Sequence, residues 1–301
     1  MNRKMTMKQP LRLLAVFAGL ILATSAIAQD SEQHELKLMA LEALMTAPPD
    51  RALPRVLKVL ESNESPEFKE RALFILSQIN HPDAASKLME LANDNGGDLQ
   101  HEAVRMVGIS GNREQIAKLR PLYATADEEL KDSILEAYLI ANDREGVLEI
   151  AQAAQDPEDF ERAVNILGAM GAREELRVLR SRGDMSESII QALAISGDVD
   201  TLLDMARDGS NLEQQVNAIE ALGIAGGGGE ALIGIYRESD SQEVRDAVRH
   251  GLLVSGHDEG VIDLYREAAD VDEKKDLLEL LVMMGSDQAM DVIDAALAGD
   301  Q

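Results

Sequence analysis

Histidine, serine and carboxylate side chains are the groups in this chain that could act in catalysis or bind a metal, and their spacing limits both. The five histidines include no pair four residues apart and no HExxH sequence, the arrangement that binds zinc on one helix face. His250 and His257 flank one turn beside Asp258, which leaves a metal site there as a minor hypothesis. No serine lies in a G-x-S-x-G sequence. We therefore expect no catalytic residue, no metal and no cofactor.

Two loops have compositions that are typical of ligand binding but lack the accompanying residues. Gly226 to Gly229 are four consecutive glycines, without the Lys-Ser/Thr that follows them in a phosphate loop. We interpret the run as a flexible turn, with a hinge as the alternative. Residues 93–98 resemble a calcium loop but lack its closing glutamate, which favours a polar turn.

The more specific pattern is a series of arginines that recurs at the spacing of the repeats described below. Arg207, Arg237 and Arg266 are separated by 30 and 29 residues, and Tyr236 and Tyr265 precede the last two. Arg120 and Arg180 lie one position off this register. One interpretation is a structural ladder in which each arginine pairs with an acid of the neighbouring repeat. The other is an Arg and Tyr strip on one side of the fold, which would bind a carboxylate-rich peptide.

The element that would position these residues is a turn that recurs about every 30 residues. Each turn closes with glycine or asparagine, the two residues that most readily take the left-handed conformation that ends a helix. The closing residues are Asn80, Gly111, Asn142, Gly171, Gly197, Gly226, Gly256 and Gly285. A helix stop at this period predicts a solenoid of paired helices.

Apolar residues recur at fixed distances from each turn. Four positions before the closing residue stand Leu76, Val107, Tyr138, Leu167, Leu193, Leu222, Leu252 and Leu281. Further apolar columns lie eight positions before it and five and eight positions after it, which gives each helix of a pair one apolar stripe. Neither helix can bury its stripe alone, so we expect an all-α solenoid of about nine stacked antiparallel helix pairs.

Three local signals refine the helix boundaries. Asp50 is expected to cap the second helix of the first pair, and Ser65 to cap a helix whose first turn holds Pro66. Pro121 falls inside the second helix of the third pair and should kink or end it.

The repeats resemble the HEAT repeats of bacterial proteins with units of about 30 residues, such as the phycobilin lyases. The resemblance covers about residues 35–297 and is clearest from Glu243 through Leu252 to Gly256 and from Phe160 to Gly171. It implies a right-handed superhelix that binds other proteins. It implies no chemistry, because the shared residues are packing and turn residues.

The first 28 residues have the composition of a secretory signal peptide. A basic segment that contains Arg3 and Lys4 precedes an apolar run from Leu13 to Leu22. Ala26 and Ala28 then form an A-x-A cleavage site before Gln29. We expect residues 1–28 to be removed and residues 29–301 to form a single solenoid domain in the periplasm. The run is short for a membrane span of about 20 residues, so stable insertion is not expected, with an uncleaved anchor as the alternative.

Charge and composition exclude several classes of partner and site. Removing residues 1–28 takes away four basic residues and no acidic one, which lowers the net charge from −26 to −30. Phosphate backbones would be repelled, so nucleic acid is not an expected partner. The chain has no cysteine, which excludes disulfides, thiol nucleophiles and thiolate zinc sites.

The function that these observations favour is an exported, non-enzymatic scaffold or adaptor that binds a protein or peptide in the cell envelope. A protein that handles a ligand or chromophore, as the phycobilin lyases do, is the alternative. An acidic cation-binding protein is a third hypothesis.

Overall fold

The structure is a computed structural model that describes residues 33–180 and 186–298. The expected signal peptide lies outside these residues, and so do Ala26, Ala28 and Gln29 at its cleavage site. Within the described ranges every regular element is a helix. None of these helices has the length and apolarity needed to cross a membrane. The expected all-α class is therefore confirmed.

The chain divides into two compact units, one up to Gln115 and one from Ile116, with the division falling inside helix α6 (Arg113–Ala117). The first unit begins with helical residues 33–42. Its further elements are the 3-10 helix η1 (Ala43–Thr46), α2 (Pro49–Leu60), α3 (Pro66–Gln78), α4 (Pro82–Ala92) and α5 (Gln100–Ser110).

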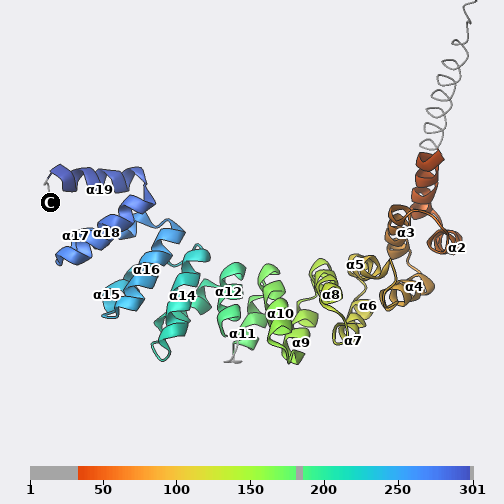
Figure 1. The fold of residues 1–301 in the computed structure, drawn as a ribbon, viewed down its shortest axis with the longest axis horizontal. Helices are drawn as coiled ribbons and strands as arrows, with labels where there is room; N and C mark the ends of the chain where they lie inside the picture. Colours follow the sequence, from red (N-terminus) through yellow and green to blue (C-terminus); the bar gives the residue numbers. More distant parts are fainter. Residues whose placement is uncertain (1–32, 181–185, 299–301) are drawn as a thin grey trace, which may run out of the picture. The chain divides into compact units, whose positions relative to one another are not determined.

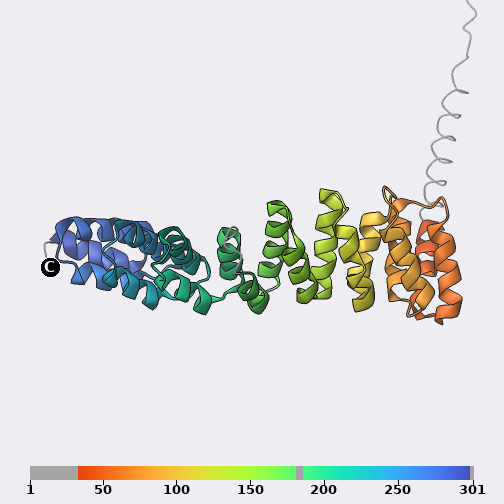
Figure 2. The same ribbon diagram turned by 90° about the horizontal axis from the view of Figure 1, so that it is seen from below.

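The second unit contains the longer series of helices. They are α7 (Leu119–Tyr123), α8 (Glu128–Ala141), α9 (Arg144–Ala153), α10 (Pro157–Ala169), α11 (Arg173–Leu179), α12 (Ser186–Ser196), α13 (Val199–Arg207), α14 (Leu212–Ile224), α15 (Gly229–Glu238), α16 (Gln242–Ser255), α17 (Asp258–Glu267), α18 (Val271–Met284) and α19 (Asp287–Ala298). Successive first helices of the pairs, such as α10, α12, α14 and α16, lie side by side in both views (Figures 1 and 2).

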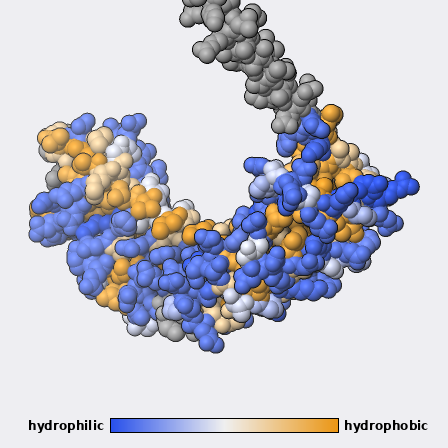
Figure 3. Space-filling view, turned by 45° about the vertical axis from the view of Figure 1, so that its right-hand side comes forward, coloured by the Kyte–Doolittle hydropathy of each residue, from blue (hydrophilic) through white to orange (hydrophobic). Residues whose placement is uncertain are grey.

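In chain order the described helices form nine pairs, the number expected from the sequence. Within the second unit each first helix packs on its own second helix and, up to α16, on the first helix of the next pair, as α12 does on α13 and α14. This arrangement is an α-solenoid. Hydrophilic residues cover most of the face drawn in Figure 3, with apolar patches between them.

The predicted apolar columns form the core. The residues four and eight positions before each turn residue are all buried, at most 1% exposed. The columns on the second helices are mostly buried as well, but Met290 is 40% exposed on the last helix. In α15 the buried positions are Leu232 and Ile235, one residue later than in other pairs, because the glycine run adds one residue.

The glycine run itself is held by its surroundings. Gly226 and Gly228 have positive φ angles of 67° and 91°. A Cβ on Gly227 would lie 2.7 Å from Val199, and one on Gly229 would lie 2.6 Å from the ring of His257. Each glycine of the run thus has a conformational or a steric reason, and the flexibility of this turn stays a prediction.

The turn residues take the left-handed conformation at seven of the eight positions, including Asn142 with a φ of 53°. Asn80 is the exception. Its helix ends one residue earlier, where Ile79 has a φ of −78°, and His81 is extended because it precedes Pro82.

Of the three local signals at the helix boundaries, two are confirmed and one is wrong. Ser65 caps α3 by accepting a hydrogen bond from the backbone N–H of Phe68, as expected. The expected cap at Asp50 is wrong, because α2 already begins at Pro49 and Asp50 lies in its first turn. The break at Pro121 is confirmed: the second helix of this pair is split into α6 and α7, since the proline ring interferes with the carbonyl four residues earlier.

Candidate functional site

The predicted arginine series contains real contacts between neighbouring helix pairs. Arg237 at the end of α15 makes a forked ion pair with Glu267 of α17, with Nε–Oε2 and Nη2–Oε1 distances of 2.9 and 2.8 Å. Arg120 of α7 pairs with Glu149 of α9. Both contacts join an arginine to an acid of the neighbouring repeat, as the ladder interpretation predicts.

The other three arginines of the series are not held in this way. Among the described residues, Arg266 has one ion contact, at 3.6 Å with Asp263 of its own helix, and both side chains are more than 60% exposed. Arg207 is exposed and forms no ion pair with any described residue. Arg180 is exposed at the end of α11. The series thus combines ladder pairs with accessible cations.

Tyr236 does not belong to an exposed strip, which corrects the sequence-based expectation. Its side chain is 2% exposed, and the Arg245 guanidinium lies 5.1 Å from the centre of its ring. Burial, followed by the negative charge of Glu273, raises the pKa of Tyr236 above its ordinary value. The aligned positions in two earlier pairs hold Ala151 and Ala206, both fully buried, but two others hold the exposed Arg120 and Arg180. The column alone therefore does not identify Tyr236 as a core residue.

Tyr265 occupies the same column but is half-buried, and it lines a hollow on the surface of the second unit. This hollow is a groove of about 690 Å³ formed by α17, α18 and α19. Its lining residues are Glu259, Ile262, Asp263, Tyr265, Arg266, Lys274, Gln288, Asp291, Val292, Ala295 and Ala296. The structure therefore brings two of the seven predicted binding residues, Tyr265 and Arg266, into one groove.

The groove combines an apolar wall with charged groups of both signs. Ile262 and Val292 supply apolar surface, and the Lys274 ammonium lies 5.5 Å from the centre of the Tyr265 ring. Arg266 and Lys274 provide cations that can pair with a carboxylate. Aromatic and arginine side chains beside apolar surface are the composition of energetically important protein contacts.

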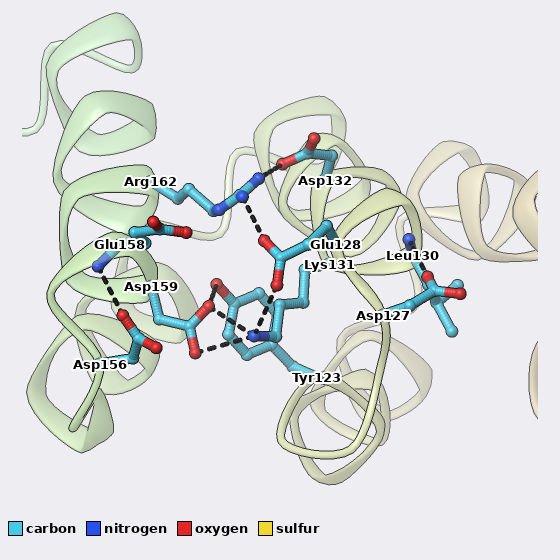
Figure 4. Close-up of polar contacts among 10 residues, drawn as sticks. All are labelled: Tyr123, Asp127, Glu128, Leu130, Lys131, Asp132, Asp156, Glu158, Asp159 and Arg162. Atoms are coloured by element: carbon cyan, nitrogen blue, oxygen red, sulfur yellow. Dashed lines mark hydrogen bonds and ion pairs between the residues drawn. The ribbon is translucent and has the colours of Figure 1, made fainter.

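A second polar cluster, which the sequence did not predict, joins α8 to α10 (Figure 4). The Lys131 ammonium lies 2.8 Å from Oδ1 of Asp159, and the Tyr123 hydroxyl donates to the same carboxylate oxygen at 3.3 Å. Burial, followed by the charge of Asp159, raises the pKa of Tyr123. Arg162 of α10 reaches back to Glu128 and Asp132 of α8.

This cluster explains part of the acidic sequence at the helix starts. Asp127 and Asp156 accept hydrogen bonds from backbone N–H groups of their own helices, as caps do. Glu128 and Asp159 additionally pair with the cations of the neighbouring helix (Figure 4). A structural role follows, since every charged group in the cluster already has a partner.

No group of three or more histidine, cysteine or acidic side chains in the described part of the chain could hold a metal ion. His250 lies in a hollow between α16 and α18, whereas Nε2 of His257 lies 3.7 Å from Oε1 of Glu230. The structure thus places the two histidines in different surroundings.

A family model of HEAT repeats matches residues 23–99 and 53–138. Over residues 23–138 the chain is therefore similar to HEAT repeats. No curated protein matches it by sequence. Among solved structures it is similar to an engineered protein, with 18% identity over 88% of this chain and 89% of that chain and a TM-score of 0.33. It is also similar to the complex of CpcE and CpcF of phycocyanin lyase from Nostoc sp. PCC7120, with 16% identity, coverage of 76% and 93%, and a TM-score of 0.33. A second engineered protein shows 17% identity, coverage of 67% and 96%, and a TM-score of 0.27.

Proposed function

We propose that this protein is a non-enzymatic HEAT-repeat scaffold that binds another protein through the groove between α17 and α19. HEAT repeats generally provide surfaces for protein partners, which supports the class of function. The observation that carries the proposal is the groove itself, where Tyr265, Arg266 and Lys274 lie beside the apolar side chains of Ile262 and Val292.

The expected occupant is a protein segment that places an apolar side chain against this wall and a carboxylate near Arg266 and Lys274. Arg266 is suited to this contact because its present pair with Asp263 is long and exposed. Arg237 is less suited, because Glu267 already occupies both sides of its guanidinium fork.

Cross-linked capture from a cell-envelope extract tests the groove. The double variant Tyr265→Ala/Arg266→Ala should lose the specific partner, whereas Arg237→Ala, which removes an exposed arginine of the same series, should retain it. Equal recovery of the same partner by both variants would contradict the assignment. A tetrapyrrole that co-purifies with the chain, detected by its visible absorbance, would instead favour the ligand-handling alternative.

We also propose that the chain is exported to the periplasm. The basic start of the sequence, the apolar run after it and the Ala26 and Ala28 pair before Gln29 support cleavage after residue 28. Mass spectrometry of the protein from a periplasmic fraction should find Gln29 at the N-terminus. An Ala28→Leu variant should remain uncleaved. Recovery of the unmodified chain with intact residue 1 in the cytosol would exclude this proposal.

A further inference from the structure

The first helices of the second unit carry an exposed apolar residue at one repeated position, two residues before the left-handed turn residue. These residues are called the apolar row: Ile140, Ala169, Ile195, Ile224, Val254 and Met283. All six are exposed. Ile195, Ile224 and Met283 are 60%, 62% and 65% exposed. Each long helix of this unit that ends in a turn thus presents at least one apolar side chain to solvent near its C-terminal end.

The apolar row is not required by the core. The residues two positions earlier on the same helices, such as Leu193 and Leu222, fill the core and are fully buried. Single apolar residues on a surface are normal, but a contiguous series of them indicates an interaction site. The repeated position therefore needs an explanation that packing within the repeats does not provide.

The helices that carry the apolar row lie close together. A Cβ on Gly223 of α14 would lie 2.7 Å from the backbone oxygen of Gly251 on α16, and one on Gly168 of α10 would lie 3.1 Å from Ala192 on α12. Packed helices are separated by about 8–10 Å, so successive members of the row recur at about this distance. Apolar patches follow one another along the upper edge of this unit in Figure 3.

A row of polar residues accompanies the apolar row, four residues earlier on each helix and therefore on the same face. Its members are Glu136, Asn165, Gln191, Glu220, His250 and Glu279. Three are carboxylates, and none is lysine or arginine. Glu136, Glu220 and Glu279 are all exposed, on a chain whose net charge is −26. The face therefore complements a basic partner.

Hollows lie beside the apolar row where it crosses from α16 to α18. One of about 250 Å³ is lined by residues that include His250, Leu253 and Met283. Another of about 200 Å³ is lined by Leu253, Met283 and Met284 among others. Spaces of this size between neighbouring members of the row can accept side chains of a bound segment.

We propose that the apolar row binds an extended, basic polypeptide segment with an apolar residue at every third position. Extended chains advance about 3.1–3.3 Å per residue, so three residues span about 9–10 Å, close to the separation of packed helices. A second copy of the chain is a poorer match, because stable dimers bury about 800 Å² on each partner and the row is one side chain wide. This surface shares no residue with the groove of the proposed function.

The test uses the full chain and a fluorescein-labelled synthetic peptide with six Leu-Pro-Lys units, followed by fluorescence anisotropy. Two control peptides have the same length: one permutes the same composition so that leucine no longer recurs every third residue, and one replaces lysine with glutamate. The Leu-Pro-Lys peptide should bind at least tenfold more tightly than either control, and its binding should weaken as salt is added. No binding at millimolar protein, or equal binding of the permuted peptide, would overturn the proposal.

Variants of the protein test whether the peptide binds at the apolar row. Ile195→Asp and Ile224→Asp should each weaken binding at least tenfold and should fold normally, because both side chains already face solvent. Val271→Asp is the matched control, since Val271 is 78% exposed at the opposite end of α18. Equal weakening by Val271→Asp would overturn the assignment. A dimer in sedimentation that Ile195→Asp dissociates would identify a second copy as the occupant and would also overturn it.

Discussion

Arg177 and Asp198 form a forked ion pair that joins two consecutive repeats. Nε of Arg177 lies 2.8 Å from Oδ2 of Asp198, and Nη2 lies 2.7 Å from Oδ1. Asp198 is 1% exposed, and it also caps α13 by accepting hydrogen bonds from the backbone and the hydroxyl of Thr201. One carboxylate therefore fixes both the start of α13 and its position against α11.

Substitution of this carboxylate should destabilise the protein. Asp198→Asn keeps the size of the side chain but removes the charge and one acceptor, which leaves Arg177 without its forked partner. We expect the free energy of unfolding to fall by about 2–4 kcal/mol, from the loss of a pair in which Asp198 is buried and Arg177 is 40% exposed, and from the weakened cap. Urea unfolding followed by circular dichroism measures the change. Glu174→Gln is the control, because Glu174 contacts the same arginine from an 81% exposed position and should have little effect.

The same carboxylate should make stability depend on pH. Burial raises the pKa of Asp198, but the hydrogen bonds from Arg177 and Thr201 outweigh it, and the pKa lies below its ordinary value. The folded state then binds fewer protons than the unfolded state at acid pH. The contribution of Asp198 to the free energy of unfolding is therefore complete at pH values above the ordinary aspartate pKa of about 3.9. It is lost as the pH falls through the lower pKa that Asp198 has in the folded state. The stability difference between wild type and Asp198→Asn should shrink from pH 7 to pH 3. A constant difference would contradict this explanation.

The turn column shows how much of the fold could be predicted from sequence. Glycine and asparagine at a fixed period indicated both the helix ends and the pairing, because left-handed backbone is costly for other residues. Asn80 departs from the pattern because Pro82 constrains the residue before it. This departure can be predicted from the sequence only when the constraint from the neighbouring proline is considered together with the repeat pattern.

The candidate site was less predictable, because it depends on packing between repeats. The equal spacing of Arg237 and Arg266 correctly indicates equivalent positions, but it cannot show that Glu267 occupies the first and leaves the second accessible. Tyr236 and Tyr265 occupy the same column, and their burial differs because the packing between repeats differs at the two positions. The groove needs side chains from α17, α18 and α19, and its width is set by how these helices pack.

Two glycines in α15 should respond to alanine in opposite directions. A Cβ on Gly229 would lie 2.6 Å from Cγ of the His257 ring, an atom close to the backbone, so Gly229→Ala should lower the free energy of unfolding by about 1–3 kcal/mol. Gly234 has no atom within 4 Å of the added Cβ, so Gly234→Ala should stabilise the helix by up to about 1 kcal/mol. Thermal unfolding of both variants tests this difference. Equal effects would show that the glycine run is not sterically held.

Tyr138 should stabilise the second unit through its hydroxyl. The side chain is 1% exposed, and its hydroxyl donates a 3.0 Å hydrogen bond to the backbone oxygen of Ile116. Tyr138→Phe leaves this buried oxygen without that donor and should cost about 1–2 kcal/mol in urea unfolding at pH 7. Tyr265→Phe is the control, since Tyr265 is only half-buried and should change stability little.

The ionisation of Tyr138 provides an independent measurement of the same burial. Burial, followed by the charge of Asp143, raises the pKa of Tyr138 to about 12. In the unfolded chain tyrosine ionises near pH 10, so between pH 10 and 12 the folded state binds more protons than the unfolded state. The contribution of Tyr138 is therefore complete below pH 10 and is lost as pH rises toward 12. The stability gap between wild type and Tyr138→Phe should narrow at pH 11, and a gap that stays constant from pH 7 to pH 11 would show that the phenol ionises equally in both states.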